Sequence, residues 1–222
     1  TVSGSLIWKG DEFTGVSQAD VALNGPATDL FGPTTDDGFY SLTSNTAGNF
    51  TIKPTKNINL KNGLDVGDVA AIQKHLVAIP GSVITDFYRL VAADCNNSGT
   101  VSTVDASLIR QVLLDNPFAI TNMSNTGSWR FIPTSFAPPA VVDPYVLAPY
   151  ETDIDLTISS DLSAQDFWGV KTGDVLYTAN PANKPDGGLT ADTLIFKAKD
   201  RLLQAGEMVS VDFEVSNFLD IA

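Results

Sequence analysis

Oxygen-bearing side chains alternate along residues 94–105, which read DCNNSGTVSTVD. A calcium loop of this length needs side-chain oxygens at positions 1, 3 and 5, glycine at 6, a carbonyl at 7, a water-bridging group at 9 and a carboxylate at 12. The residues at these positions are Asp94, Asn96, Ser98, Gly99, Thr100, Ser102 and Asp105. The spacing predicts a Ca²⁺ site; the alternative is an Asx-rich turn in which Asp105 caps a helix.

Two segments have apolar residues at three- and four-residue steps, which predicts amphipathic helices over residues 66–79 and 104–114. Their alignment places Asp68 opposite Asp105 and predicts a first loop, NINLKNGLDVGD, over residues 57–68. Its candidate ligands are Asn57, Asn59, Gly63, Asp65 and Asp68. Because Lys61 falls at position 5, we expect this loop to bind Ca²⁺ more weakly than the second loop.

An aspartate at the last loop position, followed at once by a helix and present twice, resembles the dockerin variant of the EF-hand. The ordered motifs ADCNNSGTVSTVD, GSWRFIP and DFWGVKTGDV resemble dockerin-like regions of large secreted proteins from Bacteroidetes-type bacteria. The resemblance implies a calcium-binding module over residues 56–177 and a secreted or cell-surface location. Loop positions 10 and 11 differ between the two loops, Val66-Gly67 against Thr103-Val104, so ordinary cohesin docking is not expected.

The amino-terminal segments TVSGSLIW, ADVALNG, GFYSLTS and NFTIKPT alternate apolar and polar residues between turn residues, which predicts short strands. SGSLIW, TTDDGFYSL and NFTIKP together resemble carboxypeptidase-regulatory-like and Cna-B-type modules. That resemblance implies a transthyretin-like β-sandwich over residues 1–55. The predicted fold class is therefore multidomain β plus α.

Residues 115–150 are rich in proline and aromatic side chains, which predicts an extended arm packed over a neighbouring core. Residues 178–190 have the composition of a linker. Residues 191–222 contain two alternating segments and resemble the start of a cohesin-like domain. Since two strands do not form a stable domain, their alternative role is to complete a sheet in another chain.

The net charge of −13 with scattered basic residues argues against nucleic acid as a partner. No apolar run reaches the length of a membrane span. One histidine, His75, and the lack of a recognisable catalytic motif predict that the chain is not an enzyme. A single cysteine, Cys95, predicts a free thiol.

These observations predict a non-catalytic, calcium-stabilised structural or interaction segment. Its expected partners are calcium, neighbouring domains and copies of the same protein, with assembly into a filament by strand exchange as a further hypothesis. The alternative is an accessory region of a secreted polysaccharide-degrading enzyme, which would bind carbohydrate through Trp8, Trp129 or Trp168.

Overall fold

The computed structural model describes residues 1–25, 29–182, 195–197 and 214–216. The chain divides into two compact units, Thr1–Asn183 and Lys184–Ala222. The described part of the first unit contains four helices and two four-stranded sheets, so the predicted mixture of β and α structure is confirmed.

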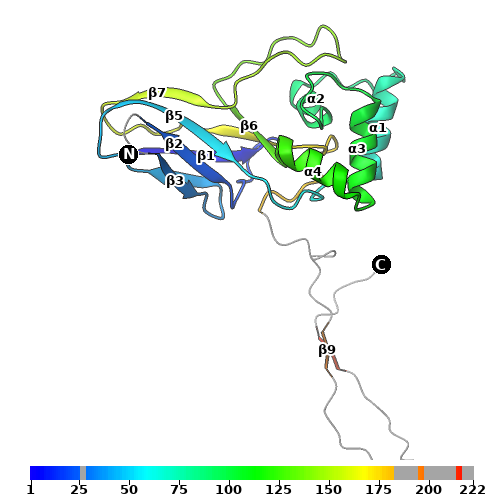
Figure 1. Cartoon of the computed structure of the whole chain (residues 1–222), viewed down its shortest axis with the longest axis horizontal. Helices are drawn as coiled ribbons and strands as arrows, with labels where there is room; N and C mark the ends of the chain where they lie inside the picture. The colour runs from blue at the N-terminus through cyan, green and yellow to red at the C-terminus, as the bar shows by residue number, and fades with distance from the viewer. Residues whose placement is uncertain (26–28, 183–194, 198–213, 217–222) are drawn as a thin grey trace, which may run out of the picture. The chain divides into compact units, whose positions relative to one another are not determined.

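One sheet has the strand order β4-β1-β8-β6, in which β1 is antiparallel to β4 and parallel to β8. Its strands are β1 (Val2–Trp8), β4 (Phe39–Leu42), β6 (Trp129–Pro133) and β8 (Phe167–Lys171). The other sheet has the order β3-β2-β5-β7 and is antiparallel throughout (Figure 1). Its strands are β2 (Asp20–Asn24), β3 (Leu30–Pro33), β5 (Gly48–Thr55) and β7 (Ile154–Ile158).

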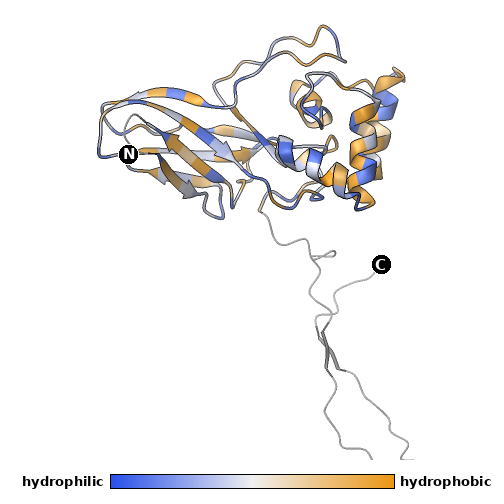
Figure 2. Cartoon of the chain, in the orientation of Figure 1, coloured by the Kyte–Doolittle hydropathy of each residue, from blue (hydrophilic) through white to orange (hydrophobic). Residues whose placement is uncertain are grey.

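Alternating burial along β1, β2, β4 and β5 creates a shared apolar core. Every second residue of β1 is buried, as expected when successive side chains point to opposite faces of a sheet. The buried cluster joins Leu6 of β1 and Phe167 of β8 to Leu23 and Ile52 of the other sheet. The alternation of orange and blue along the strands is visible in Figure 2.

The sandwich extends beyond residue 55, where the sequence predicted its end. The predicted strands correspond to β1, β2, β4 and β5, but each sheet also takes strands from much later in the chain. Leu6 of β1 lies opposite Phe167 of β8, and Ile52 of β5 lies opposite Ile154 of β7. The region assigned to the second module therefore completes the first, because alternation identifies a strand without identifying its neighbour.

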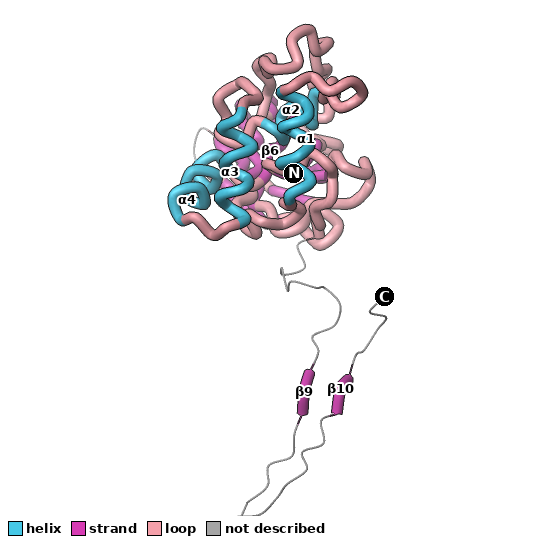
Figure 3. The backbone as a smooth tube through the Cα atoms, turned by 90° about the vertical axis from the view of Figure 1, so that its right-hand side faces the viewer, coloured by secondary structure: helices cyan, strands magenta, loops and turns pink. Residues whose placement is uncertain are grey.

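The helices pack around their own core at one end of the sheets, and they face the viewer in Figure 3. They are α1 (Val66–Leu76), α2 (Phe87–Ala93), α3 (Thr103–Leu113) and α4 (Pro117–Thr126). The predicted helices at 66–79 and 104–114 are confirmed as α1 and α3. Helix α2 was not predicted, because six of its seven residues are buried and it lacks an amphipathic period.

The region predicted as an extended arm is in part regular structure. Its beginning forms α4, which starts with Asn116 as the cap and Pro117 in the first turn, and its middle forms β6. Residues 134–153 have no regular structure apart from turns and an isolated bridge. They pack on α2, where Phe136 and Tyr150 lie 5.8 and 5.9 Å from the Phe87 ring. Only this part fits the prediction of an arm.

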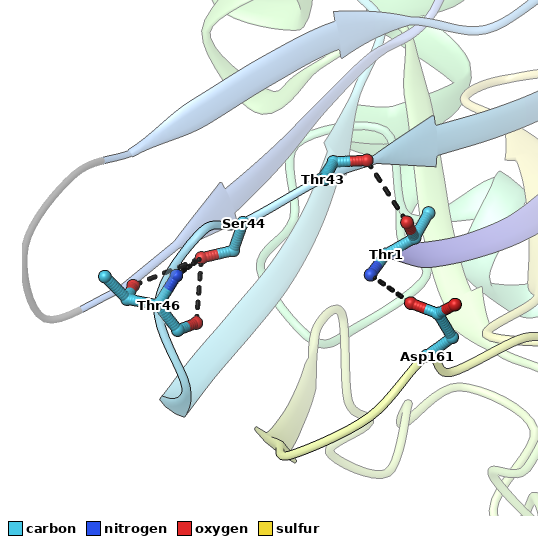
Figure 4. A network of polar contacts seen from close by, with 5 residues as sticks. All are labelled: Thr1, Thr43, Ser44, Thr46 and Asp161. Atoms are coloured by element: carbon cyan, nitrogen blue, oxygen red, sulfur yellow. Dashed lines mark hydrogen bonds and ion pairs between the residues drawn. The ribbon is translucent and has the colours of Figure 1, made fainter.

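Polar contacts join three segments beside the first strand (Figure 4). The Thr1 amino group lies 2.6 Å from Oδ1 of Asp161, and the Thr1 hydroxyl lies 3.2 Å from that of Thr43. Ser44 and Thr46 bond to each other in the adjoining turn. These groups are exposed, so they contribute little to stability.

In the second unit only β9 (Ile195–Lys197) and β10 (Glu214–Ser216) are described, and they pair antiparallel. The predicted cohesin-like start over residues 191–222, and most of the predicted linker over residues 178–190, otherwise lie outside the described residues. Across the parts of the chain that are described, none of the helices has the length and apolar character needed to cross a membrane.

Candidate functional site

The second predicted loop, residues 94–105, joins α2 to α3. Asp94 is the carboxyl-terminal cap of α2 and Ser102 is the amino-terminal cap of α3. Between them, Asn97 and Gly99 have φ angles of 56° and 77°. Asparagine and glycine adopt this left-handed conformation most readily, so the sequence supplies suitable residues where the loop turns sharply.

The two carboxylates at the ends of this loop point into it. Asp94 accepts hydrogen bonds from the amides of Ser98, at 2.9 Å, and Gly99, at 2.8 Å. Asp105 accepts one from the Ser102 amide at 2.8 Å and one from the Asn96 amide at 3.3 Å. Burial raises the pKa of Asp105, the nearby Asp94 carboxylate adds to the rise, and the hydrogen bonds from Ser102 and Asn96 oppose it.

The uncharged candidate ligands lie in the same loop. The Ser98 hydroxyl is 3.2 Å from the Thr100 carbonyl, and the Ser102 hydroxyl is 3.0 Å from Asp105. The Asn96 side-chain oxygen accepts the Ser98 amide at 3.1 Å. No group of three His, Cys, Asp or Glu side chains suited to a metal occurs among the described residues. A cation here would therefore need neutral oxygens beside the two carboxylates, which is the ligand type that Ca²⁺ accepts.

The loop is held from two sides by later segments. The Val101 amide donates to the Tyr145 carbonyl, and the Leu147 amide donates to the Gly99 carbonyl, both at 2.9 Å. From β6, the guanidinium of Arg130 donates to the carbonyls of Val91 and Asp94 at 2.6 Å each. The loop geometry therefore depends on residues that follow it in the chain.

The two halves of the first predicted loop, residues 57–68, have different roles in the structure. Asn57 donates to the Ser124 carbonyl at 2.7 Å and accepts the Ser128 amide at 3.1 Å, so its side chain is engaged at the end of α4. Asn59 has φ of 51° and its carbonyl accepts the Asn62 amide, which gives it a role in a turn. Lys61 pairs with Asp115 at 2.6 Å. The amino-terminal half of this loop thus differs from that of residues 94–105.

Residues 174–179 supply the contacts that this half lacks. Asp174 accepts the amide of Thr178 at 2.9 Å and that of Ala179 at 2.8 Å. These contacts have the same spacing as those that Asp94 makes with residues 98 and 99. Tyr177 has φ of 59°, which matches Asn97 at the equivalent position.

The carboxyl-terminal half of the first loop, residues 63–68, closes against this segment. Asp68 accepts the Leu176 amide at 3.1 Å and the Asp65 amide at 2.9 Å, as Asp105 does with residues 96 and 102. The Thr178 hydroxyl donates to the Gly63 carbonyl at 2.8 Å, as Ser98 does to residue 100. We call residues 174–179 and 63–68 together the composite loop.

The two halves of the composite loop meet at Gly63, which has φ of 74°. A Cβ atom there would lie 2.6 Å from the backbone of Ala179, so a larger residue would separate the halves. Asn62 and Asn180 join them further, each accepting a hydrogen bond from the other. Residues 178–182 therefore belong to the first unit and do not serve as a linker.

Charge is also concentrated in the composite loop. Burial raises the pKa of Asp68 to about 6, and the Asp174 carboxylate adds to the rise. Burial likewise raises the pKa of Asp174. At loop position 3, however, Leu176 offers no side-chain oxygen where residues 94–105 have an asparagine. The composite loop therefore has the poorer ligand set.

Of the predicted first-loop ligands, the structure brings together Gly63, Asp65 and Asp68, and sequence reasoning missed Asp174 and Thr178. An aspartate followed four residues later by a hydroxyl is common to DCNNS and DVLYT. That shared spacing could have identified residues 174–178, but these residues lie far along the chain from α1, the helix that follows the first loop. The separation between Asp68 and the segment it contacts is 107 residues.

Two tryptophans proposed for carbohydrate binding lie in the core. Trp8 is 9% exposed and Trp129 is 3% exposed, so neither offers a ring face to a sugar. The partly exposed Trp168 has the Lys9 ammonium 4.3 Å from its ring centre. Cys95 is buried as a free thiol, and burial raises its pKa.

Comparison of the chain with family models, curated proteins and solved structures finds no match.

Proposed function

We propose that the first unit is a non-catalytic, calcium-stabilised structural segment of a secreted or cell-surface protein. It would combine a dockerin-like pair of loops with a β-sandwich of transthyretin type. The observation that carries the proposal is the repeated set of contacts in residues 94–105 and in the composite loop. Each has a buried aspartate at its start, a second at its end, and a hydroxyl bonded to a carbonyl between them.

Electrostatics favour a cation in both loops. Asp68, Asp94, Asp105 and Asp174 are each fully buried, and none of them forms a salt bridge within the described residues. Arg130, the nearest guanidinium to the second loop, is bonded to the carbonyl of Asp94. The Lys171 ammonium acts on Asp174 through its charge and opposes the rise that burial causes in the pKa of that carboxyl. Buried charges that lack an ion pair are costly, and a divalent ion between the two carboxylates of each loop would offset that cost.

Removal of calcium is expected to lower the melting temperature. An ion at 100 times its dissociation constant stabilises the folded state by about 2.7 kcal/mol. For a unit of this size that corresponds to roughly 5–10 °C. Calorimetry in excess Ca²⁺ and in a chelator measures the difference. An unchanged melting temperature would contradict calcium stabilisation, and a magnesium titration controls for ionic strength.

The two loops are expected to bind separately and with different affinities. Asp94→Asn should weaken the tighter site, and Asp174→Asn the weaker one, each about 100-fold or more, since groups that merely orient ligands already contribute 10- to 100-fold. Isothermal titration calorimetry distinguishes the sites. Asp36→Asn, which changes an exposed carboxylate in the turn before β4, is the matched control. Loss of neither binding event in Asp174→Asn would remove the composite loop from the proposal.

Two finer parts of the hypothesis concern other residues. Assembly by strand exchange depends on residues 191–222, which lie largely outside the described part. For an accessory role in polysaccharide degradation, two of the three tryptophans proposed to bind carbohydrate are buried in the core. The calcium-stabilised structural role is therefore the one that the described residues support best.

A further inference from the structure

His75 lies in the last turn of α1 and is fully buried. Its Nδ1 accepts a hydrogen bond from the Ile84 amide at 3.0 Å. Because an acceptor nitrogen carries no proton, the neutral ring has its proton on Nε2. Nε2 lies on the side of the Pro144 carbonyl but completes no hydrogen bond among the described residues. The imidazole is therefore held as an uncharged group.

The ring of His75 packs against residues 143–147, the segment that is hydrogen-bonded to the second loop. Its centre is 5.1 Å from that of Tyr145. The Tyr145 carbonyl accepts the Val101 amide, and two residues further on the Leu147 amide donates to Gly99. Residues 143–147 thus lie between the histidine on one side and the candidate calcium loop on the other.

We propose that neutral His75 holds residues 143–147 in place by packing, and that its protonation weakens the hydrogen bonds between this segment and residues 94–105. One consequence, weaker ion binding at acidic pH, rests on the proposed calcium function. The structural part of the inference, release of the arm, holds with or without an ion.

Protonation conflicts with the surroundings of the ring. A proton on Nδ1 replaces an acceptor with a donor that faces the Ile84 amide, so the hydrogen bond is lost and a positive charge is buried. Exposed groups on the packed elements are Lys74 on α1, Asp86 before α2, Arg110 on α3 and Asp143 on the arm. Tyr145 adds a phenol, and Asp68, Asp94 and Asp105 are buried in the two loops. None of these groups contributes to the shift of the histidine.

The direction of the pH effect follows from burial. Burial lowers the pKa of His75, and the Pro144 carbonyl opposes this. The unfolded chain then binds more protons than the folded one between the ordinary histidine value, about 6.5, and the lowered value. The stabilising contribution of the neutral ring is complete above that ordinary value, and it is lost as the pH falls through the lowered one.

The test begins with the calcium-free protein, where the single histidine gives an unambiguous NMR signal. We expect a titration midpoint below the ordinary value of about 6.5. Over the same pH range, hydrogen-exchange protection of the Val101 and Leu147 amides should fall about 10-fold or more after correction for the intrinsic rate. A midpoint at or above the ordinary value, or protection that persists after the ring titrates, would overturn the proposal.

His75→Gln separates this effect from titration of the loop carboxylates. Glutamine keeps a side-chain acceptor but has no proton to gain in this range, so the pH-dependent loss of protection should vanish. Calcium titrations near pH 7.5 and near pH 5 should show a larger loss of affinity for the unmodified protein than for the variant. Equal losses would refute the inference. If no calcium binds at either pH, the proposed function fails, while the exchange measurement still decides the role of His75.

Discussion

A fragment of residues 1–55 is expected to remain unfolded, whereas residues 1–183 fold cooperatively. The fragment would lack β6, β7 and β8, and with them the buried side chains of Trp129, Phe131, Ile158 and Phe167. Each large apolar side chain contributes roughly 1.5–3 kcal/mol when fully buried. Their combined loss is of the same order as the whole stability of a domain, about 5–15 kcal/mol.

Circular dichroism and the dispersion of amide signals in NMR spectra measure this difference. The matched control is a fragment of residues 1–183, which retains all eight strands of the two sheets. A cooperative thermal transition in the shorter fragment would show that the early strands form a sandwich without β7 and β8. The result would then favour the separate module that the sequence predicted.

Arg130→Met is expected to lower the free energy of unfolding by about 2 kcal/mol or more. Methionine fills much of the same volume but donates no hydrogen bond, so the Val91 carbonyl loses the Arg130 donor and the Asp94 carbonyl keeps only the Asn97 amide at 3.3 Å. Each unpaired buried group costs about 1–3 kcal/mol. Arg130 itself is 6% exposed, so solvent does not readily replace it. Urea unfolding monitored by tryptophan fluorescence measures the change.

Arg110→Met is the matched control, because Arg110 is exposed on α3 and such substitutions change stability by about 0.5 kcal/mol or less. The Arg130 variant should also weaken calcium binding at residues 94–105, since the carbonyl it releases belongs to the first residue of the loop. A loss of stability below about 1 kcal/mol would indicate that the two carbonyls find other donors.

The elements with a clear period were predictable from the sequence. Alternation located β1 and β5, and three- and four-residue steps located α1 and α3. Helix α2 was not predictable in this way because nearly all its side chains are buried. The pairing of β1 with β8 was not predictable either, because the selection of a strand's neighbour depends on packing between distant segments.

The same distinction applies to the candidate site. Residues 94–105 are contiguous, so the spacing of their oxygens could be compared directly with the requirement for calcium. In the composite loop Asp68 and Asp174 come from different parts of the chain, and position counting along residues 57–68 selected Asn57 in place of Asp174. The Asn57 side chain is exposed and bonds to Ser124 and Ser128, whereas the Asp174 carboxylate is buried and accepts the amides of Thr178 and Ala179.

The parallel pairing of β1 and β8 has a mechanical consequence. Tension applied at Val2 and at Lys171 pulls the start of one strand against the end of its parallel neighbour, over the register from Leu6↔Phe167 to Trp8↔Gly169. The hydrogen bonds between them are then loaded together in shear and cannot open one after another. If force acts between these two points, the arrangement would give the first unit resistance to extension, independently of any ion in its loops.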